Sequence, residues 1–189
     1  MRIHSKVLLD YLYFVDECCT SVNLTFVCRI PETLNLGSNQ LTGTIRDIFG
    51  QFSDLQVLDL SENSFSGSIP TKLFNLQNIR TIALNGNQLD GRIPANYGSA
   101  ASLETLHVYE NALTGPIPNI NPGELTALVD FQVQQNRLTG SMASLVCTLR
   151  QDGVGALETL WADCSDNASP QLQCDSPACC DLCFPVDLR

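Results

Sequence analysis

LETLHVYENALTGPIP, residues 103–118, decides the fold, because two other segments repeat it at a fixed distance. The copies read IRTIALNGNQLDGRIP at residues 79–94 and LQVLDLSENSFSGSIP at residues 55–70. The asparagine in each copy is part of a series spaced by 24, 24, 24 and 25 residues, formed by Asn39, Asn63, Asn87, Asn111 and Asn136. A fixed period of this length indicates stacked coils. Such a solenoid presents an extended surface, so we look for function first on that surface and not in a catalytic cleft.

Aliphatic residues at positions 1, 4 and 6 of each copy predict one short strand per coil. The clear coils begin at residues 31, 55, 79, 103 and 128, and a last strand follows from residue 157. Positions 4 and 6 are two residues apart, which is the period of a strand. Strands stacked in register form a parallel sheet with a spacing of about 4.8 Å. Positions 2, 3, 5, 7 and 8 are then expected to be exposed on the concave face.

Asparagine at position 9 stands where the strand ends and its main-chain amides lose their ladder. Buried main-chain groups need partners, and a side-chain amide offers two donors and an acceptor. We therefore expect each Asn to bond its own coil and the next one, as an internal ladder. Position 13 is glycine in five coils, and glycine permits a positive φ or close backbone contact. These residues are Gly43, Gly67, Gly91, Gly115 and Gly140.

This pattern, LxxLxxLxLxxNxLxGxIP, resembles the plant-type subclass of leucine-rich repeats over residues 31–160. The resemblance implies an α/β fold, namely a right-handed solenoid (horseshoe) with a parallel β-sheet on the concave face. Short 3-10 or helical turns are expected on the convex side. The chain departs from the pattern at Arg46, which replaces a proline, and in the fifth coil, which runs to 29 residues.

The repeat divides the chain into three parts. Residues 1–30 are predicted to be a degraded N-terminal repeat, because Leu9, Leu12 and Phe14 fit the LxxLxL spacing. Residues 31–156 form the array of five coils. Residues 157–189 are predicted to hold the last strand and a cysteine-rich C-terminal cap.

Nine cysteines lie outside the first four coils. A loop-rich tail buries too little surface to hold itself together, so crosslinks are expected there. Six of them follow residue 140, and Cys147 with Cys164 is the first pairing we consider. The remaining four of these six can pair in three ways, and the sequence does not decide between them. Zinc is the rival interpretation, but the irregular spacing argues against a metal site. The disulfide candidates are Cys147, Cys164, Cys174, Cys179, Cys180 and Cys183.

The tail LETLWADC…C…CCDLCF resembles the cysteine-rich C-terminal caps of leucine-rich repeat proteins that are numerous in microalgae. This resemblance implies an extracellular or cell-surface location. Two glycosylation sequons, at Asn23 and Asn167, favour the same secretory route. The N-terminal MRIHSK with the following apolar stretch makes only a poor secretory signal.

Composition narrows the class of function. The formal net charge of −10 disfavours nucleic acid, which requires neutralising Lys and Arg. His4 and His107 are the only histidines, so the sequence offers almost no residues that could act as the base of a nucleophile–base triad. We therefore expect neither an enzyme nor a cofactor. No apolar run of about 18 residues is present, and any membrane tether would lie outside this chain.

The second half of the concave face gathers the candidate ligand-binding residues. Tyr and Trp are frequent anchors in binding hot spots, although Trp161 could instead cover the last coil under the cap. Acidic neighbours such as Glu104, Glu110 and Glu158 favour a basic or neutral partner. The expected function is non-catalytic recognition of a protein, peptide or cell-wall glycan. The alternatives are a truncated ectodomain of a receptor-like kinase and a structural matrix or adhesion protein. The expected contact residues are His107, Tyr109, Gln132, Gln134, Trp161, Asp130 and Asn85.

Overall fold

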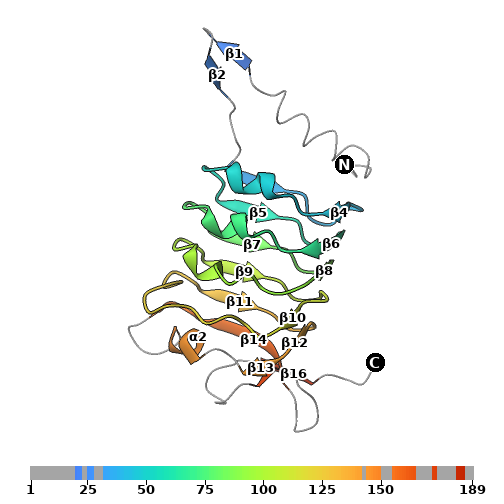
Figure 1. The fold of residues 1–189 in the computed structure, drawn as a ribbon, viewed down its shortest axis with the longest axis vertical. Helices are drawn as coiled ribbons and strands as arrows, with labels where there is room; N and C mark the ends of the chain where they lie inside the picture. The colour runs from blue at the N-terminus through green and yellow to red at the C-terminus, as the bar shows by residue number, and fades with distance from the viewer. Residues whose placement is uncertain are drawn as a thin grey trace.

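The structure is a computed structural model, and it describes residues 20–22, 25–27, 32–141, 144–149, 155–164, 172–173 and 182–185. Within these residues the main feature is a seven-stranded parallel sheet with the order β16-β14-β11-β9-β7-β5-β3. Figure 1 shows its strands stacked one above the other along the long axis of the molecule. The strands are β3 (Thr33–Asn35), β5 (Val57–Asp59), β7 (Thr81–Ala83), β9 (Thr105–His107), β11 (Asp130–Gln132), β14 (Thr159–Cys164) and β16 (Leu182–Pro185).

The register of this sheet follows the repeat. Leu58 pairs with Ile82, and Ile82 pairs with Leu106, so position 4 of one coil lies beside position 4 of the next. All three side chains have no exposed surface. Full burial of one such side chain is worth about 1.5–3 kcal/mol. The aliphatic columns therefore form one continuous core and fix the register.

Smaller sheets and turns complete the coils. The glycines at position 13 have positive φ, from 75° at Gly67 to 94° at Gly43, which returns the chain across the coil. Pro70 precedes one of the 3-10 turns on the far side, and its fixed φ of −65° suits that entry. The side sheets are β4-β6-β8 (Thr42–Thr44, Ser64–Ser68, Gln88–Asp90), β10-β12 (Thr114–Gly115, Arg137–Leu138) and β13-β15 (Gly140–Ser141, Leu172–Gln173). The far side carries the 3-10 turns η1 (Asp47–Gln51), η2 (Thr71–Asn75) and η3 (Tyr97–Ser99) and the helix α2 (Ser144–Thr148).

The asparagines join neighbouring coils. Asn87 Nδ2 donates to the carbonyls of Leu84 (3.1 Å) and Asn85 (3.2 Å) in its own coil and to that of Leu60 (3.0 Å) in the preceding coil. Its Oδ1 accepts from the amide of Phe65 at 2.9 Å, again in the preceding coil. Asn63, Asn111 and Asn136 repeat this pattern. For these four the neighbour is thus the preceding coil and not, as we predicted, the next one, because the turn at position 9 lies against the loop of the preceding coil. The bonds of Asn39 stay within its own coil, to the carbonyls of Leu36 and Gly37.

The two ends differ from the repeat. Near the N-terminus, β1 (Thr20–Val22) and β2 (Thr25–Val27) pair antiparallel as a hairpin. Most of the degraded coil that we predicted for residues 9–30 lies outside the described residues, as does Asn23. At the other end, β16 pairs in parallel with β14 and adds a strand that the repeat pattern did not predict. No helix in the described part of the chain is long and apolar enough to cross a membrane.

Candidate recognition surface

Strands β9, β11 and β14 bring together three residues that lie far apart in the sequence. Position 5 of each coil is in register with position 5 of the next, so Gln132 lies between His107 and Trp161. In the same way Asp130 lies between Thr105 and Thr159 at position 3. The sheet therefore places His107, Gln132 and Trp161 on neighbouring strands, about 5 Å apart along the solenoid axis.

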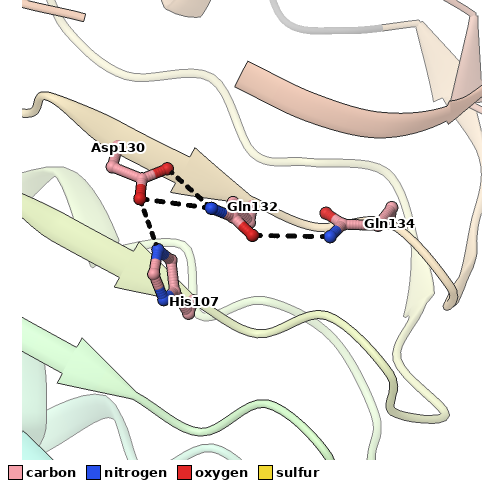
Figure 2. A network of polar contacts seen from close by, with 4 residues as sticks. All are labelled: His107, Asp130, Gln132 and Gln134. Atoms are coloured by element: carbon pink, nitrogen blue, oxygen red, sulfur yellow. Dashed lines mark hydrogen bonds and ion pairs between the residues drawn. The ribbon is translucent and has the colours of Figure 1, made fainter. Parts of the chain in front are cut away.

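A polar network links two coils across this surface (Figure 2). His107 Nε2 lies 2.6 Å from Asp130 Oδ2. Gln132 Nε2 donates to Asp130 Oδ1 at 3.1 Å and Oδ2 at 3.2 Å, and Gln134 Nε2 donates to Gln132 Oε1 at 3.5 Å. The side chains of His107 and Asp130 remain 23% and 26% exposed. The network thus fixes the imidazole while leaving part of it open to a ligand.

Tyr109 lies beside this network and is surrounded by carboxylates. Its ring centroid is 5.9 Å from that of His107, with an angle of 58° between the planes. Partial burial raises the pKa of Tyr109, and the negative charges of Glu110, Glu62 and Asp130 raise it further. A hydrogen bond from Asn85 acts in the opposite direction. Tyr109 is therefore a half-buried aromatic ring in a negative field.

Three residues at position 7 are buried where we predicted exposure, whereas Ser61 and Tyr109 in the same column stay partly exposed. Asn85, Gln134 and Asp163 are only 6%, 4% and 5% exposed. Asn85 is held by its hydrogen bond with Tyr109 of the next coil, and Gln134 by its bond to Gln132. Neighbouring side chains thus cover Asn85 and Gln134 at the ends of their strands. The Oε1 atom of Gln134 is buried without any hydrogen-bond partner.

Asp163 has a role that the repeat pattern did not indicate. In the middle of the array, the amides of Glu62 and Asn63 donate to the carbonyls of Asn85 (2.9 Å) and Gly86 (3.2 Å) in the following coil. At the last coil, the amides of Gln135 and Asn136 donate instead to Asp163 Oδ1 (2.7 Å) and Oδ2 (3.0 Å). Burial raises the pKa of Asp163, while these two bonds lower it. The carboxylate thus ends the main-chain series in place of two carbonyl groups.

The rim of the surface is acidic. Arg80 is paired with Glu104, and His107 with Asp130. Glu158 is exposed at the far end of the same face. Glu62 and Glu110 are also exposed, and neither forms an ion pair within the residues whose side chains the structure describes. Among the described side chains, the carboxylates of Glu62 and Glu110 are therefore not neutralised by an ion pair.

The cysteine-rich tail falls mostly outside the described side chains. Cys147 is disulfide-bonded. Its partner, the other disulfide candidates and Asn167 lie outside the residues whose side chains are described, so their pairing stays a prediction. Among those residues no group of three His, Cys, Asp or Glu side chains could hold a metal ion.

The repeats and the stacked sheet define a leucine-rich repeat solenoid of the plant type. The family model described as "Leucine rich repeat" matches residues 32–89. The side sheets beside the main one and the short 3-10 turns agree with this fold. The predicted fold class is therefore confirmed.

Known proteins with this fold include plant receptors. Phytosulfokine receptor 1 of Arabidopsis thaliana is 34% identical over 68 residues, which cover 33% of this chain and 6% of the receptor. The plant peptide hormone receptor RGFR1, solved in complex with RGF2, has a TM-score of 0.61 and 32% identity, covering 69% of this chain and 20% of that one. The BIR2 ectodomain from Arabidopsis thaliana has a TM-score of 0.61 and 29% identity, covering 79% of this chain and 72% of the other.

The chain thus spans only a small part of the length of the curated relatives that it matches, whereas it covers 72% of the solved BIR2 ectodomain. These similarities support a receptor-like ligand-binding module.

Proposed function

We propose that this protein is a non-catalytic recognition module that binds a peptide on the concave face of its main sheet, at the cell surface or outside the cell. The patch formed by His107, Tyr109, Gln132 and Trp161 carries this proposal. It joins aromatic rings to a fixed polar network on neighbouring strands. Aromatic anchors surrounded by polar groups are typical of binding hot spots.

An extended peptide suits this surface better than a compact ligand. The open sheet offers side chains at a regular spacing of about 4.8 Å per coil, which a chain lying across the coils can meet one after another. RGFR1, which shares the fold, was solved with RGF2 and is described as a peptide hormone receptor. By analogy with that receptor, we propose a peptide as the ligand of this protein.

The receptor interpretation is the second candidate, and a specific similarity favours it. Alignment with the BIR2 ectodomain covers 72% of that chain. An ectodomain of this kind would recognise its ligand here, and any kinase activity would lie in a domain outside these residues. Proteins and cell-wall glycans are the two other classes of ligand that the surface could accept.

The test is an array of secreted peptides and cell-wall oligosaccharides incubated with the purified protein. We expect peptides to bind, and His107→Ala together with Gln132→Ala to weaken binding about tenfold, since few residues dominate such interfaces. Asp54→Ala is the control, because Asp54 is exposed in the loop that precedes β5 and away from the network. Binding that the double variant leaves unchanged, or that only oligosaccharides show, would overturn the proposal.

A further inference from the structure

The side sheets carry two arginines that lie on either side of one threonine. In β12 Arg137 is in register with Thr114, and its amide donates to the carbonyl of Leu113 at 2.8 Å. The amide of Thr114 donates in the same way to the carbonyl of Gly91 at 2.7 Å, so Thr114 lies beside Arg92. With strands about 4.8 Å apart, the backbones of the two arginines are separated by roughly 10 Å along the solenoid axis.

The side chain of Arg92 extends from its own coil toward the coils that follow. A Cβ atom added to Gly115 would lie 3.1 Å from Nε and 3.4 Å from Cδ of Arg92. Gly115 belongs to the next coil and is in register with Leu138, the residue after Arg137. Glycine at this position therefore leaves room for Arg92 to cross the neighbouring strand in the direction of Arg137. Figure 1 shows β8, β10 and β12, which carry or adjoin these residues, one after another along one side of the solenoid.

Neither arginine is neutralised by an ion pair. Lys72 and Arg80 each pair with a carboxylate of an adjacent coil. Arg92 and Arg137 are exposed and form no ion pair within the described residues. Asp90 lies two residues before Arg92 on the same face and is not within ion-pair distance of it. A chain with a net charge of −10 thus keeps two neighbouring cations unpaired on one surface, and an anionic ligand is their complement.

The rest of this face is small and polar. Side chains at positions 10, 12 and 14 of the described coils point outward, because those at positions 11 and 15 are buried in the core. The outward residues include Ser68, Thr114 and Thr139, and none of them is aromatic or a large aliphatic residue. A protein partner would find no such anchor here. The hydroxyl of Thr114 donates to the carbonyl of Gly91 at 3.0 Å and still has acceptor sites for the hydroxyl groups of a glycan.

The spacing and the chemistry of the two arginines favour one class of ligand. A guanidinium group binds a carboxylate through two parallel N–H···O bonds. Two guanidinium groups along one axis require a ligand that carries carboxylates at intervals. A linear polyuronate, which is a glycan with a carboxylate on every sugar, meets this requirement and also supplies hydroxyl groups to the polar surface around the arginines.

We propose that the side-sheet surface formed by Arg92, Thr114 and Arg137 binds a linear polyuronate glycan. This surface belongs to the side sheets, whereas the proposed peptide site is on the concave face of the main sheet. The inference therefore goes beyond the proposed function and does not depend on it. One molecule can hold both ligands at the same time.

The experiment compares a fluorescently labelled oligogalacturonate with its fully methyl-esterified form. The ester keeps the sugars and removes the charges, so we expect it to bind at least about tenfold more weakly than the acid. Fluorescence anisotropy at a salt concentration of about 0.15 M measures the dissociation constants. The buffer contains no calcium, because a divalent cation could bridge the glycan to the acidic groups of the protein.

Protein variants locate the binding surface. Arg92→Gln/Arg137→Gln should weaken binding of the acid form about fivefold, as expected for the loss of two exposed ion pairs. Arg92→Lys/Arg137→Lys keeps the charge and loses the planar fork of donors, so its affinity should fall between wild type and the glutamine variant. Arg46→Gln/Lys72→Gln is the matched control, because it removes the same charge from exposed residues of the first two coils. This control should change the affinity by less than about twofold.

Asp90→Asn provides a variant with the opposite sign. Asp90 is exposed on the same face as Arg92, and its carboxylate repels an anionic ligand. Removing this charge should strengthen binding of the acid form about twofold and leave the ester unchanged. Damage to the fold cannot explain a gain in affinity. An affinity that falls or stays the same in this variant would count against the surface.

The outcomes separate this inference from the proposed function. If the ester binds as well as the acid, or if the arginine variant and its control respond equally, the polyuronate surface is overturned. A polyglutamate or a sulfated glycan that binds more tightly than the oligogalacturonate through the same arginines overturns the choice of ligand. Peptide binding on the concave face should not respond to Arg92→Gln/Arg137→Gln, and glycan binding should not respond to His107→Ala/Gln132→Ala. Each proposal can therefore fail without the other.

Discussion

The pKa of Tyr109 responds to the negative charges around its phenol group. Partial burial and the charges of Glu110, Glu62 and Asp130 all raise its pKa. We expect Glu62→Gln/Glu110→Gln to lower this pKa toward the ordinary value while the burial effect remains. Absorbance of the ionised phenol between pH 8 and 12, taken as the difference from Tyr109→Phe, isolates this group. An unchanged titration would show that the two glutamates lie too far from the ring to affect it.

Asp163 should make the stability of the protein depend on pH. Its pKa is raised in the folded state, chiefly by burial, and in the unfolded chain it is about 3.9. The folded state therefore holds this proton more tightly, and the contribution to stability is complete below the unfolded pKa. It is lost as the pH rises through the raised folded value.

The comparison with Asp163→Asn isolates this term. The amide cannot accept both main-chain bonds, so we expect it to cost about 1–3 kcal/mol. The difference in the free energy of unfolding between wild type and variant should be larger at pH 3 than at pH 7. Urea denaturation at each pH measures it, and a difference that grows with rising pH would contradict the buried carboxylate.

Single residues show how far the repeat pattern reaches. Positions 4 and 6 were predictable because a period of two in every coil admits one buried face, and Leu58 and Leu84 are fully buried. The burial of Asn85 at position 7 was not predictable, because it depends on a residue of the next coil. Tyr109 covers Asn85 and forms a hydrogen bond with it. Asp163 replaces main-chain carbonyls only where the series ends, which no internal repeat could indicate.

The asparagine ladder is the element that holds neighbouring coils together. Asn87 bonds four main-chain groups in two coils. Asn87→Leu leaves these groups unpaired, and we expect it to lower the free energy of unfolding by more than about 2 kcal/mol. Chemical denaturation measures the loss.

Gln88→Leu is the control for that variant. Gln88 is the next residue, is exposed, and starts a strand of the side sheet. It should change stability by less than about 0.5 kcal/mol, as surface substitutions usually do. If Asn87→Leu costs no more than this control, the ladder bonds contribute little.

The elements at the two ends could not be read from the repeat. The hairpin of β1 and β2 pairs antiparallel, a local arrangement that owes nothing to stacking. At the other end β16 follows β14 in the main sheet, although β15 lies between them in the sequence, and it still adopts the parallel register. The period of 24 or 25 residues is lost there, so the sequence signal for a further strand was lost as well.

Across the whole molecule, the disulfide of Cys147 is expected to tie the array to its tail. Cys147 lies in α2, packed against the core, and is oxidised. Non-reducing peptide mapping should join the Cys147 peptide to a C-terminal cysteine peptide, with Cys164 the first candidate. A native disulfide of this kind contributes about 2–5 kcal/mol, so reduction should lower the midpoint of thermal unfolding. A free thiol at Cys147 in the purified protein would contradict this assignment.

The net charge of −10 sets the conditions for every binding measurement. Exposed charges are screened within about 8 Å at 0.15 M salt. The general attraction between a cationic ligand and the acidic protein should therefore fade as salt rises, while contacts to the half-buried Tyr109 persist.

The direction of the ladder has a consequence for how the chain grows. Asn63, Asn87, Asn111 and Asn136 bond the preceding coil, so main-chain groups of one coil are completed only by the coil synthesised after it. During translation the most recently synthesised coil therefore lacks some of its hydrogen-bond partners. The amides of Gln135 and Asn136 stay unpaired until Asp163 has been synthesised. New coils that lengthen this solenoid should therefore be inserted before Asp163. Its carboxylate accepts the main-chain bonds of the preceding coil and has no N–H group with which to continue the series.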